Sequence, residues 1–218
     1  GAEQSGRNWG WVRQQNRDER ELPLIKHSLE LWGELNEAIG ADTGFRRTGV
    51  LYVTDRQADL DDWERWVTLA RGYQVHSTML TAAQAREMTP GCDKPWLGGV
   101  HSPTDGKGEP TMAAPVLAEA ARRLGVSLHQ NCAARALETA GGKVSGVITE
   151  HGTIRTSRVL CAGGAWSSMF CRHHGIDLPL AGVRSTSFFT APAPNITDGG
   201  ISTPDVTFRR RLDGGYTI

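Results

Sequence analysis

The chain has 218 residues, 24 Lys and Arg balanced by 24 Asp and Glu, and a mean hydropathy of -0.38. This length accommodates one large domain or two small ones with a sizeable core. The balanced charge excludes an electrostatic case for nucleic acid or an anionic membrane as the main partner. No apolar run approaches the roughly 18 residues that cross a bilayer. We therefore expect a soluble globular protein without a transmembrane segment.

The first half of the chain alternates extended and helical patterns. Residues 1–10, rich in Gly and small polar residues, predict a loop. Apolar residues recur every three or four positions over 18–39 and predict a helix, whereas the β-branched and aromatic stretch 45–54 predicts a strand. The next expected elements are a helix at 55–73, a helix at 81–88 that Thr81 caps, and a short strand at 97–101.

The second half opens with an amphipathic helix predicted at 110–124, with Pro110 in its first turn. Three strands with tight turns between them, a short helix and two more strands around a loop then follow. Their expected bounds are 127–137, 144–150, 152–161, the helix 167–174, the strand 179–190, the loop 191–204 and the strand 206–218. Mixed helices and strands place the fold class as α/β or α+β.

The four cysteines are scattered at Cys92, Cys132, Cys161 and Cys171, with no C-x-x-C pair. In a chain of this length they predict no disulfide framework and favour a reducing compartment. We therefore expect a cytoplasmic protein, with peripheral association at the inner membrane as the alternative. The grouping of Cys171 with His173 and His174 matches no common zinc spacing, so no metal site is expected.

Several segments carry a family likeness. Residues 5–13 (SGRNWGWVR) resemble the flavin-facing loop of the FAD-dependent oxidoreductases that include D-amino-acid oxidase, glycine oxidase and sarcosine oxidase. Residues 159–167 (VLCAGGAWS) resemble the strand and A-G-A-W-S signature of that family. The Glu109-Pro110 pair, the strands over 131–152 and the segment 209–216 follow in the family's order. The likeness covers nearly the whole chain.

The resemblance implies two partial domains. A Rossmann-like FAD/NAD(P)-binding domain would comprise residues 1–44 and 100–180, and an antiparallel-sheet substrate domain would comprise 45–99 and 181–218. The family begins with a strand, a G-x-G-x-x-G turn and a helix that bind the dinucleotide. That unit is absent from this sequence, so we expect the chain to be the central part of a longer protein.

FAD is the cofactor that the resemblance implies, and two groups of residues would hold it. They are Ser5, Gly6, Arg7, Asn8, Trp9 and Gly10 in the first loop, and Ala134, Ala162, Gly163 and Gly164 later in the chain. Short polar groups can bond phosphate or ribose oxygens, Arg7 can offset diphosphate charge, and glycine lets backbone approach a flat ring. The alternatives are a polar surface loop and, for Ala134, an ordinary strand position. Trp166 is expected to pack in the core.

Arg13 corresponds to the family residue that pairs with the substrate carboxylate, a role that suits the two-pronged guanidinium. Gln14 and Gln15 would line the same pocket. The alternative is a surface ion pair between Arg13 and Asp18 or Glu19. Arg46, Arg47 and Arg209 to Arg211 are weaker candidates, because strand residues alternate between faces.

The function that the resemblance implies is oxidation of the C–N bond of an amino acid or N-methylated amine, by hydride transfer to flavin. The partners would be a small-molecule amine or amino acid and an electron acceptor, which is oxygen, a quinone or a partner protein or subunit. One alternative is a 2-hydroxy-acid or glycerol-phosphate-type dehydrogenase, favoured if several basic residues converge on the pocket. The other is a non-catalytic fragment or assembly subunit without bound flavin.

Overall fold

The computed structural model describes residues 3–218, and they form two compact units. The large unit comprises residues up to 124 together with 187–218, and the small unit comprises residues 125–186. The functional division predicted from the family likeness, with boundaries near 44, 99 and 180, stays a prediction.

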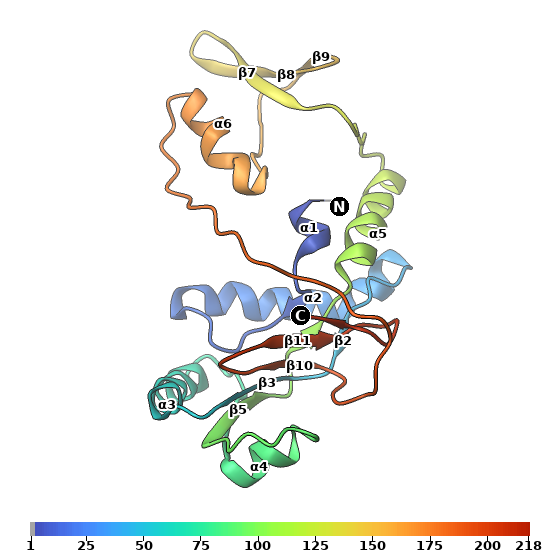
Figure 1. The fold of residues 1–218 in the computed structure, drawn as a ribbon. Helices are drawn as coiled ribbons and strands as arrows, with labels where there is room; N and C mark the ends of the chain where they lie inside the picture. Colours follow the sequence, from blue (N-terminus) through green and yellow to red (C-terminus); the bar gives the residue numbers. More distant parts are fainter. Residues whose placement is uncertain (1–2) are drawn as a thin grey trace. The chain divides into compact units, whose positions relative to one another are not determined.

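The large unit contains most of the regular structure (Figure 1). Its helices are α1 (Gln4–Arg7), the 3₁₀ turn η1 (Glu19–Glu21), α2 (Leu22–Ile39), α3 (Gln57–Arg71), α4 (Ala82–Glu87) and α5 (Pro110–Arg123). Its strands are β1 (Trp11–Val12), β2 (Arg46–Arg47), β3 (Val50–Thr54), β4 (Thr78–Thr81), β5 (Gly98–Ser102), β6 (Gly106–Lys107), β10 (Gly200–Ser202), β11 (Thr207–Arg210) and β12 (Tyr216–Thr217).

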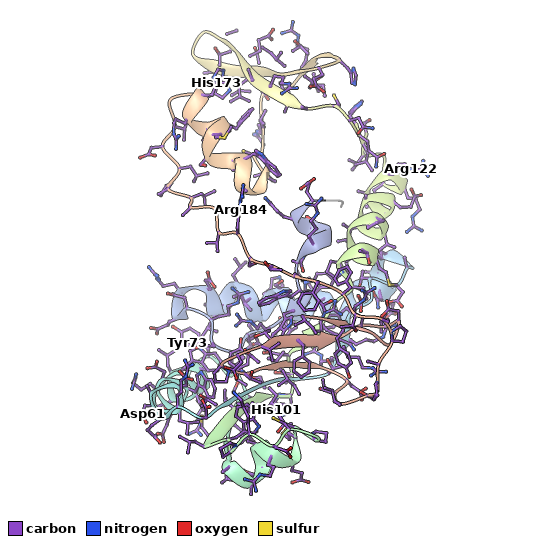
Figure 2. All side chains as sticks on the ribbon, in the orientation of Figure 1. Asp61, Tyr73, His101, Arg122, His173 and Arg184 are labelled. Carbon is purple, nitrogen blue, oxygen red and sulfur yellow. The ribbon has the colours of Figure 1, made fainter. Side chains whose placement is uncertain are left out.

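A six-stranded sheet in the order β12-β11-β10-β3-β5-β4 organises the core of the large unit (Figure 1). Only the β10–β3 pair is parallel. Successive side chains of β3 face opposite sides. Leu51 and Val53 pack with Ala85 of α4, whereas Tyr52 packs with Trp63 of α3. The sheet therefore has a hydrophobic layer on each face, and Figure 2 shows side chains filling both sides.

A second, three-stranded sheet in the order β1-β6-β2 secures the start of the chain. Trp11 lies opposite Lys107, and Lys107 lies opposite Arg46, in antiparallel register. The two-residue strand β1 thus pairs with β6, which in turn pairs with β2. Because β1 is held in this sheet, the start of the segment that follows Val12 has a fixed position.

The small unit is a three-stranded antiparallel meander followed by a short helix. Its elements are β7 (Ala134–Ala140), β8 (Lys143–Thr149), β9 (Gly152–Arg155), the 3₁₀ turn η2 (Gly164–Trp166) and α6 (Ser167–His173). The main-chain N–H of Leu137 donates to His174 Nε2 at 3.1 Å, which ties the end of α6 to β7.

The predicted helices at 18–39, 55–73, 81–88, 110–124 and 167–174 are confirmed with small changes at their ends. The side chain of Thr81 caps α4 as expected and forms a capping box with Gln84. The strand predicted at 45–54 is divided into β2 and β3, because Gly49 between them has a φ of +74°. No helix of the described residues has the length and apolar character that crossing a membrane requires.

Several strand and loop predictions were wrong. Residues 1–10 were expected to be a loop, but α1 occupies four of them, and residues 1 and 2 lie outside the described part. The expected strand 179–190 is reduced to its last residues, where Phe189 bridges Thr217 and main-chain hydrogen bonds join Phe188 to Ile218 and Thr190 to Tyr216. Strands β1, β4 and β6 were not predicted, and β10 lies in the expected loop 191–204.

Candidate cofactor and substrate site

A pocket of about 400 Å³ lies in the large unit, between the segment around β1, one side of α2 and the start of α5. Four residues singled out from the sequence line it, namely Ser5, Asn8, Gly10 and Arg13. Gly6, Arg7, Trp9, Gln14 and Gln15 are not among its lining residues. The rest of the wall includes Trp11, Val12, Arg17, Leu29, Trp32 and Ala113. The lining of the pocket therefore combines polar groups with apolar side chains.

The turn that leads into the pocket is held by Asn8. Its side-chain amide donates to the carbonyl of Ser5 at 2.9 Å, and its Oδ1 accepts from the main-chain N–H of Gly10 at 2.7 Å. Asn8 thus ends α1 and directs the chain into β1. Arg7 instead forms an exposed ion pair with Glu3 at 3.5 Å, so its role at a diphosphate stays a prediction.

Gly10 is required by the protein's own backbone. Its φ is +74°, and a Cβ there would lie 2.4 Å from the carbonyl oxygen of Gly108. The sequence suggested that this glycine makes room for a flat ring, but the structure gives a second reason that needs no ligand. Gly200 on β10 is also constrained, because a Cβ would lie 2.9 Å from the indole ring of Trp11. Both glycines therefore fix the position of β1.

A buried ion pair lies directly behind this turn. Arg209 Nη1 and Glu109 Oε1 are 2.8 Å apart, and their side chains are 1% and 8% exposed. Arg209 Nε also donates to the carbonyl of Trp9, and Glu109 accepts from the main-chain N–H of Leu212 at 2.9 Å. One charged pair thus joins the N-terminal turn, the start of α5 and the C-terminal strands.

Arg13 follows β1 and lines the pocket. One guanidinium nitrogen, Nη1, donates to the carbonyl of Gln15, and the group lies 5.9 Å from the centre of the Tyr52 ring. Within residues 3–218 it has no ion-pair partner, since Asp18 pairs with Arg20 and Glu19 accepts from Tyr73. The surface ion pair considered as an alternative is therefore absent. Burial lowers the pKa of Arg13, and the nearby Tyr52 opposes this change.

Gln14 and Gln15 are 5% and 0% exposed, and the buried carboxylate of Asp105 holds both. The main-chain N–H groups of Gln14 and Gln15 donate to its two oxygens at 2.9 and 3.0 Å. Burial raises the pKa of the Asp105 carboxyl, and the N–H donors and Arg13 oppose the rise. Asp105 was not predicted as a site residue, because an Asp followed by Gly in the sequence indicates only a turn.

Buried polar atoms without a partner gather in this region. They include both atoms of the Gln15 side-chain amide, the indole N–H of Trp11 and Nε of Arg17, considering the described residues only. A buried polar group left unpaired costs about 1–3 kcal/mol. Trp11 and Arg17 also line the pocket. A ligand with a flat apolar body and polar edges, such as a flavin ring, fits this combination of donors and apolar wall.

The remaining predicted cofactor residues lie in the small unit. Ala134 begins β7, and Ala162, Gly163 and Gly164 form the turn into η2. All four are exposed, and Gly164 has a φ of +57°. Their contribution to cofactor binding stays a prediction. The expectation for Trp166 was wrong, because its side chain is 53% exposed in a unit without a buried apolar core.

Comparison with known proteins decides the family. A family model described as FAD dependent oxidoreductase matches residues 1–218, which is the whole chain. The chain belongs to the FAD dependent oxidoreductase family. The likeness inferred from the loop at 5–13 and the signature at 159–167 is thereby confirmed. The family is one of enzymes that work with FAD.

Individual relatives agree with this placement. Mitochondrial sarcosine dehydrogenase of Homo sapiens is 28% identical over 221 residues, which cover 96% of this chain and 24% of that protein. Sarcosine oxidase subunit beta of an Arthrobacter species is 31% identical over 163 residues, covering 72% of this chain and 40% of that protein. This chain therefore spans less than half the length of these curated relatives.

The solved structure of L-amino acid deaminase from Proteus myxofaciens, in complex with anthranilate, superposes with a TM-score of 0.87 and 31% identity. The match covers 99% of this chain and 49% of that one. The predicted fold class, a mixed α and β fold of the FAD-binding type with an antiparallel-sheet part, is confirmed by this likeness and by the sheets described above.

Proposed function

We propose that this chain is the central part of an FAD-dependent enzyme that oxidises the C–N bond of an amino acid or an N-methylated amine. The observation that supports this most is Arg13. It is a cation without an ion-pair partner in the described chain, it lines the pocket, and it follows the loop that carries the family likeness. The relatives named for sarcosine and amino acids favour the same substrate class.

The residues that would hold FAD are those of the N-terminal turn and the pocket wall. Ser5 and Asn8 present short polar groups, and Trp11 presents a buried indole N–H that lacks a partner in the described chain. When bound, FAD supplies the acceptor for the hydride that leaves the carbon next to nitrogen. For the small unit, the prediction that the main-chain N–H groups of Ala162, Gly163 and Gly164 bind FAD is supported by their exposure.

The part of this chain in the reaction is to bind and orient the substrate. One side of the Arg13 guanidinium is engaged by the Gln15 carbonyl, which leaves its other N–H groups for a carboxylate. A charge-assisted pair of this kind fixes both the position and the direction of a small substrate. The apolar wall formed by Leu29, Trp32 and Ala113 would exclude water from the reacting carbon.

A second candidate function has one observation in its favour. Arg17 lines the pocket together with Arg13, so two basic residues converge there. Several basic residues that converge on the pocket would favour a 2-hydroxy-acid or glycerol-phosphate-type dehydrogenase. An additional anionic group on the substrate would pair with Arg17, whose only ion-pair partner among the described residues, Glu21, is 3.9 Å away.

The experiment is a substrate screen on the full-length purified protein. The absorbance band of oxidised flavin would first establish whether FAD is bound. Sarcosine, glycine, D- and L-amino acids, lactate and glycerol 3-phosphate are then added without oxygen, and bleaching of that band is followed. Bleaching by amines or amino acids supports the proposal, and bleaching by lactate or glycerol 3-phosphate alone supports the second candidate. A protein without flavin would contradict both and favour a non-catalytic subunit.

The electron acceptor follows from the same material. Reoxidation of the bleached protein by air would indicate oxygen, and reoxidation by a soluble quinone alone would indicate a dehydrogenase. A requirement for a second protein would indicate a partner subunit. The cytoplasmic location also stays a prediction, supported by the scattered, free cysteines.

A further inference from the structure

Asp105 has an unusual environment for a carboxylate. It is 0% exposed, it lies in the turn between β5 and β6, and no cationic side chain in the described chain donates a hydrogen bond to it. Its donors are instead main-chain N–H groups, Gln14 N to Oδ1 at 2.9 Å and Gln15 N to Oδ2 at 3.0 Å. The side-chain amide of Gln14 adds a longer contact of 3.4 Å. Both oxygens therefore hold one short segment of backbone.

Asp105 is itself fixed to the core of the large unit. Its carbonyl accepts from the main-chain N–H of Gly49 at 2.8 Å, and its own N–H donates to the carbonyl of Ser102 at 3.3 Å. These bonds join it to the β2–β3 turn and to the end of β5. A carboxylate held in this way is a rigid support, 90 residues away in sequence from the segment that it binds.

The Asp105 carboxylate influences the position of Arg13 through the backbone that it binds. With the N–H groups of Gln14 and Gln15 directed at Asp105, the chain reverses at Asn16, whose φ is +56°, and Arg17 N donates to the carbonyl of Gln14 at 3.2 Å. In this turn the carbonyl of Gln15 accepts from Arg13 Nη1. The orientation of the guanidinium thus depends on the segment that Asp105 holds.

We infer that Asp105 is a positioning residue, which holds the Gln14–Gln15 backbone so that Arg13 presents its free N–H groups to a substrate carboxylate. This inference rests on the proposed function, since it needs Arg13 to be the carboxylate site. Asp105 itself does not touch the substrate, because it is fully buried and does not line the pocket.

Asp105→Asn in the full-length flavoprotein tests the inference. The asparagine is nearly isosteric and has one acceptor oxygen, but its NH₂ group would face a main-chain N–H, so one donor loses its partner. We expect KM for the best amino-acid substrate of the screen to rise at least about tenfold, with kcat changed by less than about threefold. Asp105→Ala should raise KM further if it folds, and Asp105→Asn keeps the test valid if it does not.

Two comparisons separate positioning from general damage. Asp59→Asn is the matched control, because Asp59 accepts from Thr54 Oγ1 at 2.6 Å at the start of α3 and does not touch the Gln14–Gln15 segment. Its KM should equal that of the wild type. In an Arg13→Lys background, Asp105→Asn should raise KM by less than about twofold, because the guanidinium that it positions is already gone.

Each outcome bears on one claim. If the wild-type flavoprotein oxidises no amine or amino acid, the proposed function is wrong and this inference falls with it. If the wild type is active but Asp105→Asn has unchanged KM, or has the same effect with and without Arg13, the proposed function stands and the positioning role is wrong. A rise in KM that needs Arg13 and that Asp59→Asn does not reproduce supports the role.

Discussion

The large and small units differ in how they bury their side chains. The large unit contains three buried hydrophobic clusters, built on both faces of the six-stranded sheet and between α2 and α3. In the small unit, all of whose residues 125–186 the structure describes, no apolar side chain is fully buried. Strand β9 is exposed along its whole length.

Because of this difference, the two units support different kinds of binding site. In the large unit, Arg13, Gln14 and Gln15 are fixed by hydrogen bonds to a buried frame. In the small unit, Ala134 and the turn 162–164 offer exposed backbone with no such frame. Substitutions should therefore act through side-chain geometry in the large unit and have smaller effects in the small unit.

Breaking the buried Arg209–Glu109 ion pair should reduce the stability of the fold more than any other substitution considered. Glu109→Ala leaves the charge of Arg209 buried without its partner, which should lower the free energy of unfolding by about 3–5 kcal/mol. Urea unfolding followed by tryptophan fluorescence measures it. Glu119→Ala is the control, because the Glu119–Arg122 pair is exposed and its loss should change the free energy of unfolding far less. Equal effects of the two variants would contradict the comparison.

Core substitutions compare the two units directly. Leu51→Ala, at a side chain 4% exposed, should cost about 2–5 kcal/mol, whereas Ile148→Ala on β8, 39% exposed, should cost less than about 1.5 kcal/mol. Hydrogen exchange followed by mass spectrometry would show which peptides lose protection. Comparable losses of stability would mean that the small unit has a buried core of its own.

A substitution at Arg13 tests the proposed substrate-binding site rather than the hydrophobic core. Arg13→Lys keeps the charge but removes the two-pronged donor, and should weaken binding of an amino-acid substrate by about 1.5–3 kcal/mol, seen as a higher KM. Arg20→Ala is the control, since its side chain is 89% exposed and its ion-pair partner is Asp18. An unchanged KM in Arg13→Lys, with flavin still bound, would show that another residue binds the substrate carboxylate.

The pH dependence of stability that Asp42 contributes should be a smaller effect than those above. Bonds from Arg46 and the N–H of Gly44 lower the pKa of Asp42 from 3.8 to about 2. Asp42 therefore stabilises the fold above pH 3.8, and this contribution is lost as pH falls through about 2. The side chain is 46% exposed, so screening limits the effect to about 1 kcal/mol.

Melting temperatures of the wild type and Asp42→Asn should differ at pH 6 and converge in acid. Glu37→Gln, an exposed change on α2, controls for loss of one negative charge and should match the wild type throughout. A difference between wild type and Asp42→Asn that persists at the lowest pH would show that Asp42 acts through something other than its ionised form.

The sequence predicted the features that local patterns encode. The spacing of apolar residues predicted the helices α2 and α5. The segment 5–13 singled out Arg13, which lines the pocket. The short strands β4, β6 and β10 were missed, because each is defined by a partner far along the chain. Asp105 was missed for the same reason, since its partners are backbone groups near residue 14 and carry no side-chain pattern.

Gly200 has a consequence for how this pocket could change over evolution. The ring of Trp11, one wall of the pocket, rests against a position on β10 that has no side chain. Adding even a methyl group there would displace the indole and alter the outline of the pocket, while Arg13 and Arg17 would keep their charges. The absence of a side chain at position 200 thus sets the size of the pocket, and one small substitution there would change which ligands fit.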